Sequence, residues 1–171
     1  MDEQARRVGD AAVVDDYEGS QTRLVQAFDA SDEVLLRFNP ENRFEGVSPL
    51  NQSHFTIEKE GLRITATGTD PQILLPRFST GSEREALVRI DLDAPADTGF
   101  QVFYLPFGVS TYGAHTINRF LHRGENTIYF ALTDSQLGGG PLRVDPGMSA
   151  GDYFITNLEV RTVPAGSISD P

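Results

Sequence analysis

Alternating apolar and polar residues mark short strands along much of this chain. The cleanest run covers residues 87–92, where Val88, Ile90 and Leu92 alternate with Arg89 and Asp91. Residues two apart in an extended strand lie on the same face, so this pattern predicts a strand with one buried face.

A polar stretch at 58–60 separates two further apolar segments, 55–57 and 61–67. This arrangement predicts a β-hairpin with Leu62, Ile64 and Ala66 turned inward. A second hairpin is predicted from 116–121 and 125–132, on either side of Arg123-Gly124. Other strands are expected at 11–14, 33–38, 73–75 and 100–105. For residues 22–30 the alternatives are a single helical turn and a strand, of which we prefer strand or irregular structure.

The C-terminal third contains three consecutive glycines, Gly138 to Gly140, followed by a short apolar segment at 142–145. An Asp-Pro-Gly turn then leads to a final strand in which Phe154, Leu158 and Val160 are expected on one apolar face. We interpret these two segments as a closing β-hairpin.

Ten or eleven short strands with almost no helix predict an all-β fold, either a sandwich or a barrel. The 16 glycines and 10 prolines among 171 residues agree with many turns. The length favours one domain, expected to span 11–164, with a flexible N-terminus at 1–10 and a flexible tail at 165–171. The loop at 39–53 lacks periodicity and is one candidate wall of a binding site.

Charge and composition exclude several classes of function. The net charge of −11 disfavours nucleic acid as a partner, because phosphate backbones are repelled. The absence of cysteine excludes disulfides and thiolate metal sites. No run of about 18 apolar residues and no signal peptide is present in the sequence, so no membrane span is expected.

The order Leu142-Arg-Val-Asp-Pro-Gly147, a glycine at 151 and Ile155-Thr-Asn-Leu-Glu-Val160 resembles the C-terminal end of galactose-binding-like jelly rolls. The resemblance continues more loosely through 64–76 and 101–104. Such two-sheet antiparallel β-sandwiches serve as carbohydrate-binding modules. The resemblance therefore implies a non-catalytic module that binds a polysaccharide or oligosaccharide and tethers an attached enzyme or surface protein. It also implies a secreted or cell-surface location as part of a larger protein.

Aromatic rings and planar polar groups are the side chains that bind sugars, because rings cover the apolar face of a pyranose and polar groups bond its hydroxyls. The chain has no tryptophan, so tyrosine and phenylalanine would provide the rings. The candidate ligand-binding residues are Arg77, Tyr104, Phe107, Tyr112, His115 and Arg119. The alternative interpretation is that these rings close the rim of the core.

The resemblance further implies a structural calcium ion between acids near the first strand and polar residues of the last. The candidate oxygen ligands are Asp16, Glu18, Asn157 and Glu159. An equally simple interpretation is a solvated acidic turn beside an outward-facing polar strand.

Two other functions stay open at this point. An accessory sandwich with a structural or interaction role would use the same framework without a sugar site. The other is a small jelly-roll lyase or hydrolase. A polysaccharide lyase would need a base and an acid, for which Tyr112 and His115 are candidates. No catalytic residue is assigned, because the nucleophile-elbow, phosphate-loop and calcium-loop patterns all lack a required residue.

Overall fold

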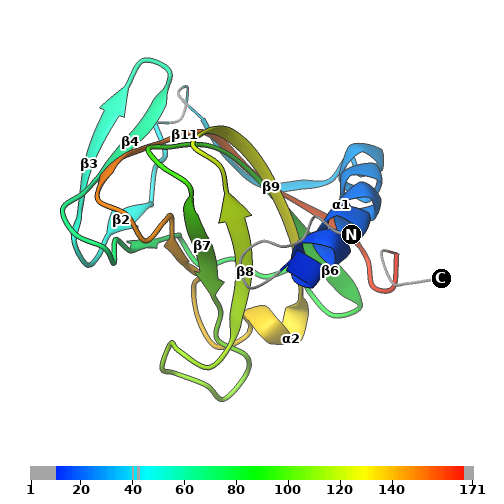
Figure 1. The fold of residues 1–171 in the computed structure, drawn as a ribbon. Helices are drawn as coiled ribbons and strands as arrows, with labels where there is room; N and C mark the ends of the chain where they lie inside the picture. The colour runs from blue at the N-terminus through cyan, green and yellow to red at the C-terminus, as the bar shows by residue number, and fades with distance from the viewer. Residues whose placement is uncertain (1–10, 40, 42, 168–171) are drawn as a thin grey trace.

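The computed structural model describes residues 11–39, 41 and 43–167, and for residues 11–20 it describes the backbone alone. Two antiparallel sheets pack face to face (Figure 1). Sheet A consists of β1 (Val34–Phe38), β3 (Ser53–Glu58), β4 (Gly61–Ala66), β6 (Arg84–Ala94), β9 (Gly124–Thr133) and β11 (Gly151–Pro164). Sheet B consists of β2 (Ser48–Pro49), β5 (Ile73–Leu74), β7 (Thr98–Phe103), β8 (Thr116–Leu121) and β10 (Arg143–Asp145). The predicted all-β, two-sheet sandwich is confirmed.

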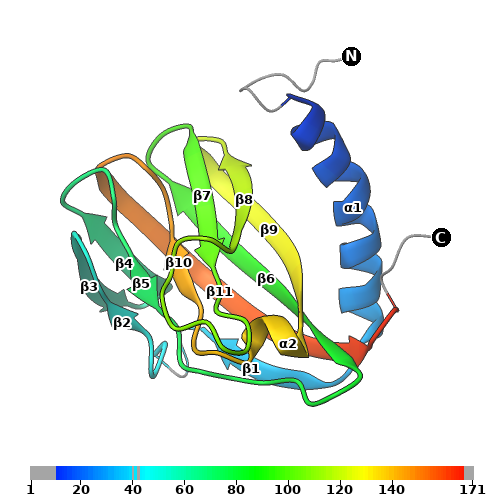
Figure 2. The ribbon, with the colours of Figure 1, turned by 90° about the horizontal axis from the view of Figure 1, so that it is seen from below.

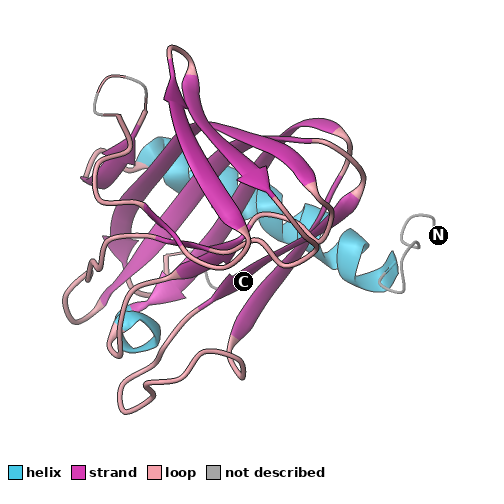
Figure 3. Ribbon diagram, turned by 90° about the vertical axis from the view of Figure 1, so that its left-hand side faces the viewer, coloured by secondary structure: helices cyan, strands magenta, loops and turns pink. Residues whose placement is uncertain are grey.

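The strand order is β3-β4-β11-β6-β9 in sheet A, where β1 also pairs with β11, and β2-β5-β10-β7-β8 in sheet B. From β4 onward the chain changes sheet at almost every connection, which is the jelly-roll arrangement. Figure 3 shows the two layers of strands with the long helix outside them. The predicted hairpin of β3 and β4 is present, paired from Ser53–Ala66 to Glu58–Gly61.

The core lies between the two sheets and is built from the inward residues of each strand. Sheet A contributes Ile64, Val88 and Ile90, all fully buried, and sheet B contributes Phe100 and Val102. Burial of the predicted core residues Leu62, Ile64, Val88, Ile90, Leu92, Leu158 and Val160 is confirmed. Removal of this much apolar surface from water is the main stabilising term of the fold.

The prediction that Phe154 faces the core was wrong. The pairing of β11 with β6 contains a bulge between Ile155 and Asn157, and a bulge inserts one unpaired residue into a strand. Tyr153 and Ile155 are therefore inward before the bulge, whereas Leu158 and Val160 are inward after it. Phe154 lies on the outer face, beneath the guanidinium of Arg63.

Two predicted hairpins were also wrong, for one common reason. β8 pairs with β7 in sheet B whereas β9 pairs with β6 in sheet A, so the turn at Arg123-Gly124 crosses between sheets. Likewise β10 lies between β5 and β7 in sheet B, and β11 is central in sheet A. A turn between consecutive strands looks the same in sequence whether or not those strands pair.

The largest correction concerns the N-terminal segment, which was expected to contain a strand at 11–14 and strand or irregular structure at 22–30. It forms one helix, α1 (Ala11–Ala30), beside β6 and β9 on the outside of sheet A (Figure 2). Leu24 and Phe28 of α1 pack on Leu87, Tyr129 and Val163, a cluster separate from the main core. Burial of this i, i+4 apolar pair stabilises a long helix, where the sequence alone suggested at most a single helical turn at 22–30.

The C-terminal end of α1 is held by β11. Arg161 Nη1 donates to the carbonyl oxygens of Phe28 (2.8 Å) and Ser31 (2.9 Å), and its guanidinium lies 4.2 Å from the centre of the Phe28 ring. These bonds satisfy carbonyls that the end of a helix leaves unpaired, and the positive charge suits the negative end of the helix dipole. Residues 1–10 and 168–171, predicted to be flexible, lie outside the described residues.

The loop between β7 and β8, residues 104–115, closes against α2 (Asp134–Leu137) and the segment that follows it. Gly139 N donates to Leu105 O (2.7 Å), and Phe107 N donates to Ser135 O (3.1 Å). The Tyr112 hydroxyl donates to Pro141 O (2.6 Å). We call this set of contacts the loop clasp.

The middle glycine of the triple-glycine segment makes the loop clasp possible. A Cβ at position 139 would lie closer than 3.0 Å to the carbonyl oxygens of Leu105, Pro106 and Val109, a separation that real Cβ atoms do not show. At position 138 the three nearest atoms all belong to the side chain of Phe107, and the backbone of Gly138 has ordinary right-handed helical angles. Gly139 thus allows two backbones to pack closely.

We therefore expect Gly139→Ala to lower the free energy of unfolding by about 1–3 kcal/mol, because three backbone carbonyls would have to move. Gly138→Ala is the matched control and should stay within about 0.5 kcal/mol of wild type, since the exposed Phe107 ring can turn aside. Urea unfolding followed by circular dichroism measures both. Equal stability of the two variants would contradict the assigned role of Gly139.

Candidate functional site

The outer faces of the two sheets differ in how far the protein's own contacts occupy them. On sheet A, α1 covers part of β6 and β9. Elsewhere on that face Arg63 pairs with Glu58 and Asp152, and Arg89 lies 3.4 Å from Asp91. Most of the charged groups of that face therefore already bind one another.

The outer face of sheet B is defined by the strand register, because paired residues of neighbouring strands point to the same side. The inward residues Ile73, Val144, Val102 and Ile117 alternate with the outward ones. We call the outward set the sheet B face. It consists of Ser48, Leu74, Arg143, Phe103 and Thr116 in one row, Asp145, Gln101 and Asn118 in the next, and Gly99 and Phe120 in a third.

An ion pair stacked on an aromatic ring forms the centre of the sheet B face. Arg143 donates from Nε and Nη2 to the two carboxylate oxygens of Asp145, at 2.9 and 2.8 Å. The guanidinium carbon lies 4.0 Å from the centre of the Phe103 ring and 5.6 Å from that of Tyr112. Burial raises the pKa of the Asp145 carboxyl, an effect that the hydrogen bonds and charge of Arg143 oppose and the charge of Asp70 reinforces.

Two amides lie beside this ion pair and face solvent. Gln101 Nε2 donates to Asn118 Oδ1 (2.9 Å), and Asn118 Nδ2 donates to Thr116 Oγ1 (3.2 Å). Asn118 is exposed and Gln101 is half-buried. Each amide retains donors and acceptors beyond these bonds, so the row can bind hydroxyl groups of a ligand.

Apolar groups lie at the far end of the sheet B face. Phe120 pairs across strands with Gly99 and is 40% exposed, and Met148 is 51% exposed. The Met148 side chain rests on Gly99, where its Cε would lie 3.2 Å from an added Cβ. Four residues separate the Gly99 row from the Phe103 row, which corresponds to roughly 13 Å along β7.

Tyr112 forms the other end of the sheet B face. The loop clasp fixes its hydroxyl on Pro141 O, and its ring lies beside Arg143. Burial raises the pKa of the Tyr112 hydroxyl, although the charge of Arg143 acts in the opposite direction. The β7–β8 loop thus places an aromatic ring at the edge of an otherwise polar centre.

The structure brings five of the six predicted ligand-binding residues together around the loop clasp. Arg77 Nη2 donates to Gly138 O (2.7 Å), and the exposed Phe107 ring lies against Gly138. The rings of Tyr104 and His115 are 5.5 Å apart, and Gln136 Nε2 donates to the Tyr104 hydroxyl. Of these five, Tyr112 borders the sheet B face.

The sixth predicted residue, Arg119, lies apart from the others. It pairs with Phe100 on the inward side of the edge strand β8, and its Nη2 donates to Tyr129 O of β9 (3.3 Å). An inward-pointing charge is a common feature of edge strands, where it opposes pairing with another chain. Arg119 therefore links the two sheets at this edge.

Sequence analysis missed Gln101, Asn118, Phe120, Arg143 and Asp145 as candidate site residues. Their common signal is alternation within β7, β8 and β10, whose opposite positions are buried in β7 and β10 and half-buried in most of β8. That signal becomes informative only when the three strands are known to be neighbours, because their residues are far apart in the sequence.

The predicted calcium ligands fall on two different elements. Asp16 and Glu18 belong to α1 instead of an acidic turn, and their side chains lie outside the described set. Asn157 lies at the bulge of β11 opposite Asp91. Among the residues that the structure describes, no group of three or more His, Asp or Glu side chains is arranged to hold a metal ion.

Glu159, the fourth predicted calcium ligand, has two guanidinium partners. Its Oε2 lies 2.7 Å from Arg161 Nε and 3.2 Å from Arg37 Nη2. Burial alone would raise the pKa of the Glu159 carboxyl, but the hydrogen bonds and charges of Arg37 and Arg161 outweigh burial and leave that pKa below its ordinary value. A cation at Glu159 would have to displace these partners.

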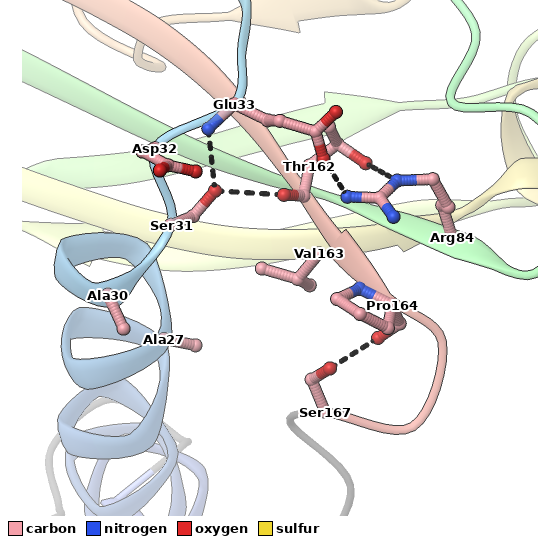
Figure 4. A pocket seen from close by; sticks show the side chains of 10 residues that line it. All are labelled: Ala27, Ala30, Ser31, Asp32, Glu33, Arg84, Thr162, Val163, Pro164 and Ser167. Carbon is pink, nitrogen blue, oxygen red and sulfur yellow. Dashed lines mark hydrogen bonds and ion pairs between the residues drawn. The ribbon is translucent and has the colours of Figure 1, made fainter.

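A pocket of about 490 Å³ lies where α1 ends, between the start of β6 and the end of β11 (Figure 4). Its polar groups bind one another: Ser31 Oγ donates to Thr162 O (2.8 Å), Arg84 Nε donates to Thr162 Oγ1 (2.8 Å), and Arg84 also pairs with Glu33. This network joins the segment between α1 and β1 to β6 and β11, which is a structural role.

Neither described helix has the length and apolar character needed to cross a membrane. The sequence matches no protein-family profile and no curated protein. Similarity to known proteins is therefore found at the level of solved structures.

The chain is similar to the CBM22-1 xylan-binding domain from Paenibacillus barcinonensis, with 18% identity and a TM-score of 0.57 over 80% of this chain and 98% of that one. It is similar to the second N-terminal cellulose-binding domain of β-1,4-glucanase C from Cellulomonas fimi, with 13% identity and a TM-score of 0.55 over 78% and 95%. The enzymatically active domain of tailspike protein 4 of bacteriophage CBA120 is also similar, with 10% identity and a TM-score of 0.50 over 73% and 20%. These similarities show that the fold is the β-sandwich of carbohydrate-binding modules.

Proposed function

We propose that this chain is a non-catalytic carbohydrate-binding module that holds a polysaccharide on the sheet B face. The observation that carries the proposal is the polar row of Asp145, Gln101 and Asn118 across the middle of the sheet B face. Aromatic and apolar side chains lie at the two ends of that face, Tyr112 beside Arg143 at one end and Phe120 with Met148 at the other. A sugar chain across this face would place hydroxyls over the polar row and apolar ring faces against the aromatic ends.

Charge supports a neutral ligand. The protein carries a net charge of −11, and the cation of the sheet B face, Arg143, is paired with Asp145. An acidic polysaccharide would meet repulsion from the whole molecule without a compensating local cation. A neutral polysaccharide exchanges hydrogen bonds with water for hydrogen bonds with the amides, so we expect weak binding.

The local chemistry favours binding over lyase catalysis. The Tyr112 hydroxyl is engaged with Pro141 O, and its pKa is raised by burial. A tyrosine that removes a proton near neutral pH needs a lowered pKa, which is the opposite shift. The ring of His115 lies instead beside that of Tyr104, tilted by 43° with the ring centres 5.5 Å apart. We accordingly assign Tyr112 to the edge of a binding surface.

The proposal extends to the context of the domain. Two of the sugar-binding structures that are similar to this chain are domains, one of them of a glucanase. We infer that this chain is likewise one module of a larger secreted or cell-surface protein, which it tethers to a polysaccharide. A structural accessory sandwich would not need the exposed ring of Phe120 on the sheet B face.

The proposed site predicts that Asn118→Ala and Phe120→Ala each weaken retention in native gels that contain soluble xylan, β-glucan or a cellulose derivative. Loss of one hydrogen bond or one ring contact costs about 0.5–1.5 kcal/mol, which corresponds to roughly 2- to 12-fold in affinity. Thr127→Ala on the outer face of sheet A is the matched control and should bind as wild type does. All three variants should keep the wild-type melting temperature within about 2 °C, because their side chains are outward.

If Thr127→Ala reduced retention as much as Asn118→Ala does, the polysaccharide would bind outside the sheet B face. Absence of retention of the wild-type protein on any neutral polysaccharide would overturn the proposed function. Tyr112→Ala is a poorer test, because loss of its bond to Pro141 also removes part of the loop clasp.

A structural calcium ion remains a separate prediction of the sequence resemblance. If Asp16, Glu18, Asn157 and Glu159 bind calcium, excess calcium should raise the melting temperature and a chelator should lower it. A ligand present at 100 times its dissociation constant adds about 2.7 kcal/mol to the free energy of unfolding. Identical thermal unfolding with calcium and with chelator would mean that these four residues hold no ion of consequence.

A further inference from the structure

Arg143 is the cation within the rows that define the sheet B face, and Asp145 holds two of its nitrogens at once. The pair is bidentate, and the side chains of Arg143 and Asp145 are 16% and 7% exposed. A bidentate pair fixes the plane of a guanidinium and neutralises its charge. The Phe103 ring beneath, 4.0 Å from the guanidinium carbon, holds the same plane from below.

The pair lies where a ligand of this face would pass. Arg143 is next to Phe103 in one row, and Asp145 is next to Gln101 in the following row. The Tyr112 ring borders the guanidinium on one side. A ligand that bonds Gln101 and Asn118 would thus lie beside the ion pair, so the charge of the pair selects among ligands.

We propose that Asp145 determines the charge class of the ligand: by occupying Arg143 it restricts the sheet B face to neutral polysaccharides, and its neutralisation opens the face to acidic ones. This inference rests on the proposed function, because it concerns the same face. Asp145 acts through Arg143 and is a specificity-determining residue without a direct contact to the anion.

The groups that face Asp145 give the direction of a pH effect. Arg143 on β10 favours the ionised carboxylate, whereas burial and the negative charge of Asp70, just before β5, favour the protonated form. The net result is a raised pKa, so Asp145 takes up its proton at a higher pH than an ordinary aspartate. Arg143 is then released from its ion pair as the pH falls, while a sulfate ester on a polysaccharide stays ionised.

The test uses a fluorescein-labelled dextran sulfate oligosaccharide and its unsulfated dextran counterpart, with binding measured by fluorescence anisotropy at pH 7 and low salt. Asp145→Asn keeps the size of the side chain and removes its charge. We expect it to bind the sulfated probe about tenfold or more tightly than wild type, since a charge-assisted hydrogen bond is among the stronger polar contacts. The gain should disappear at high salt.

Two controls separate this effect from a change in net charge. Asp91→Asn removes the same charge beside Arg89 on the outer face of sheet A and should leave binding of the sulfated probe unchanged. The double variant Arg143→Gln with Asp145→Asn should lose the gain completely. Equal gains in Asp145→Asn and Asp91→Asn, or a gain that persists without Arg143, would overturn the proposal.

The unmodified protein provides a second readout in case Asp145→Asn does not fold. As the pH is lowered from 7 toward 4, wild type should gain more affinity for the sulfated probe than Arg143→Gln does. Identical pH profiles of these two proteins would overturn the proposal. Binding of a neutral polysaccharide by wild type is measured in parallel. If the proposed function is wrong, wild type does not bind the neutral polysaccharide. If only the role of Asp145 is wrong, wild type still binds the neutral polysaccharide.

Discussion

The β7–β8 loop can close on the segment after α2 only because Gly139 has no side chain. Three carbonyl oxygens, those of Leu105, Pro106 and Val109, occupy the space that a Cβ would need. This close approach allows the short bond from Gly139 N to Leu105 O, and it brings Tyr112 onto Pro141 and Arg143. The candidate site therefore depends on a backbone contact that lies outside it.

Charged side chains are distributed differently on the two outer sheet faces, and we assign a structural role to those of sheet A and a binding role to the face of sheet B. On sheet A, Arg161 and Glu159 hold the end of α1, and Arg63 links β4 with β3 and β11. These side chains stabilise the fold through mutual contacts. On sheet B the charged groups are concentrated in one central pair, and the surrounding amides and rings remain open to solvent. Ligand binding is favoured where polar side chains have hydrogen-bond donors and acceptors that the protein's own contacts do not use.

Alternation predicted the inner faces of β4 and β6 well, because each is long enough for several inward residues to repeat. It failed in β11, where the bulge near Asn157 shifts which residues face inward. Phe154 is apolar but lies on the outer face, so it conceals the shift between Ile155 and Leu158 in the apolar pattern. It failed again in α1, which is stable because Leu24 and Phe28 find partners on sheet A. Those partners are more than 50 residues away in sequence, so local propensity could not reveal them.

The candidate site likewise contains residues whose proximity follows from the local sequence and others that only the tertiary structure brings together. Tyr104, Phe107, Tyr112 and His115 share one loop, so their proximity could be predicted from sequence. Asn118 and Arg143 become neighbours of Gln101 and Phe103 only through the order β10-β7-β8. Jelly-roll strands pair across long stretches of chain, and for that reason a site built on a sheet face is largely hidden from sequence analysis.

The most direct test of this account is a titration of the ¹⁵N-labelled protein with a neutral xylo- or cello-oligosaccharide, followed by NMR chemical shifts of backbone and side-chain amides. The account predicts that the largest shifts fall on Gln101, Asn118, Phe120 and the 110–113 segment, with the side-chain amides of Gln101 and Asn118 among them. Residues of β3, β4 and α1 should not respond. Shifts confined to sheet A or to α1, or no shifts at oligosaccharide concentrations in the millimolar range, would contradict it.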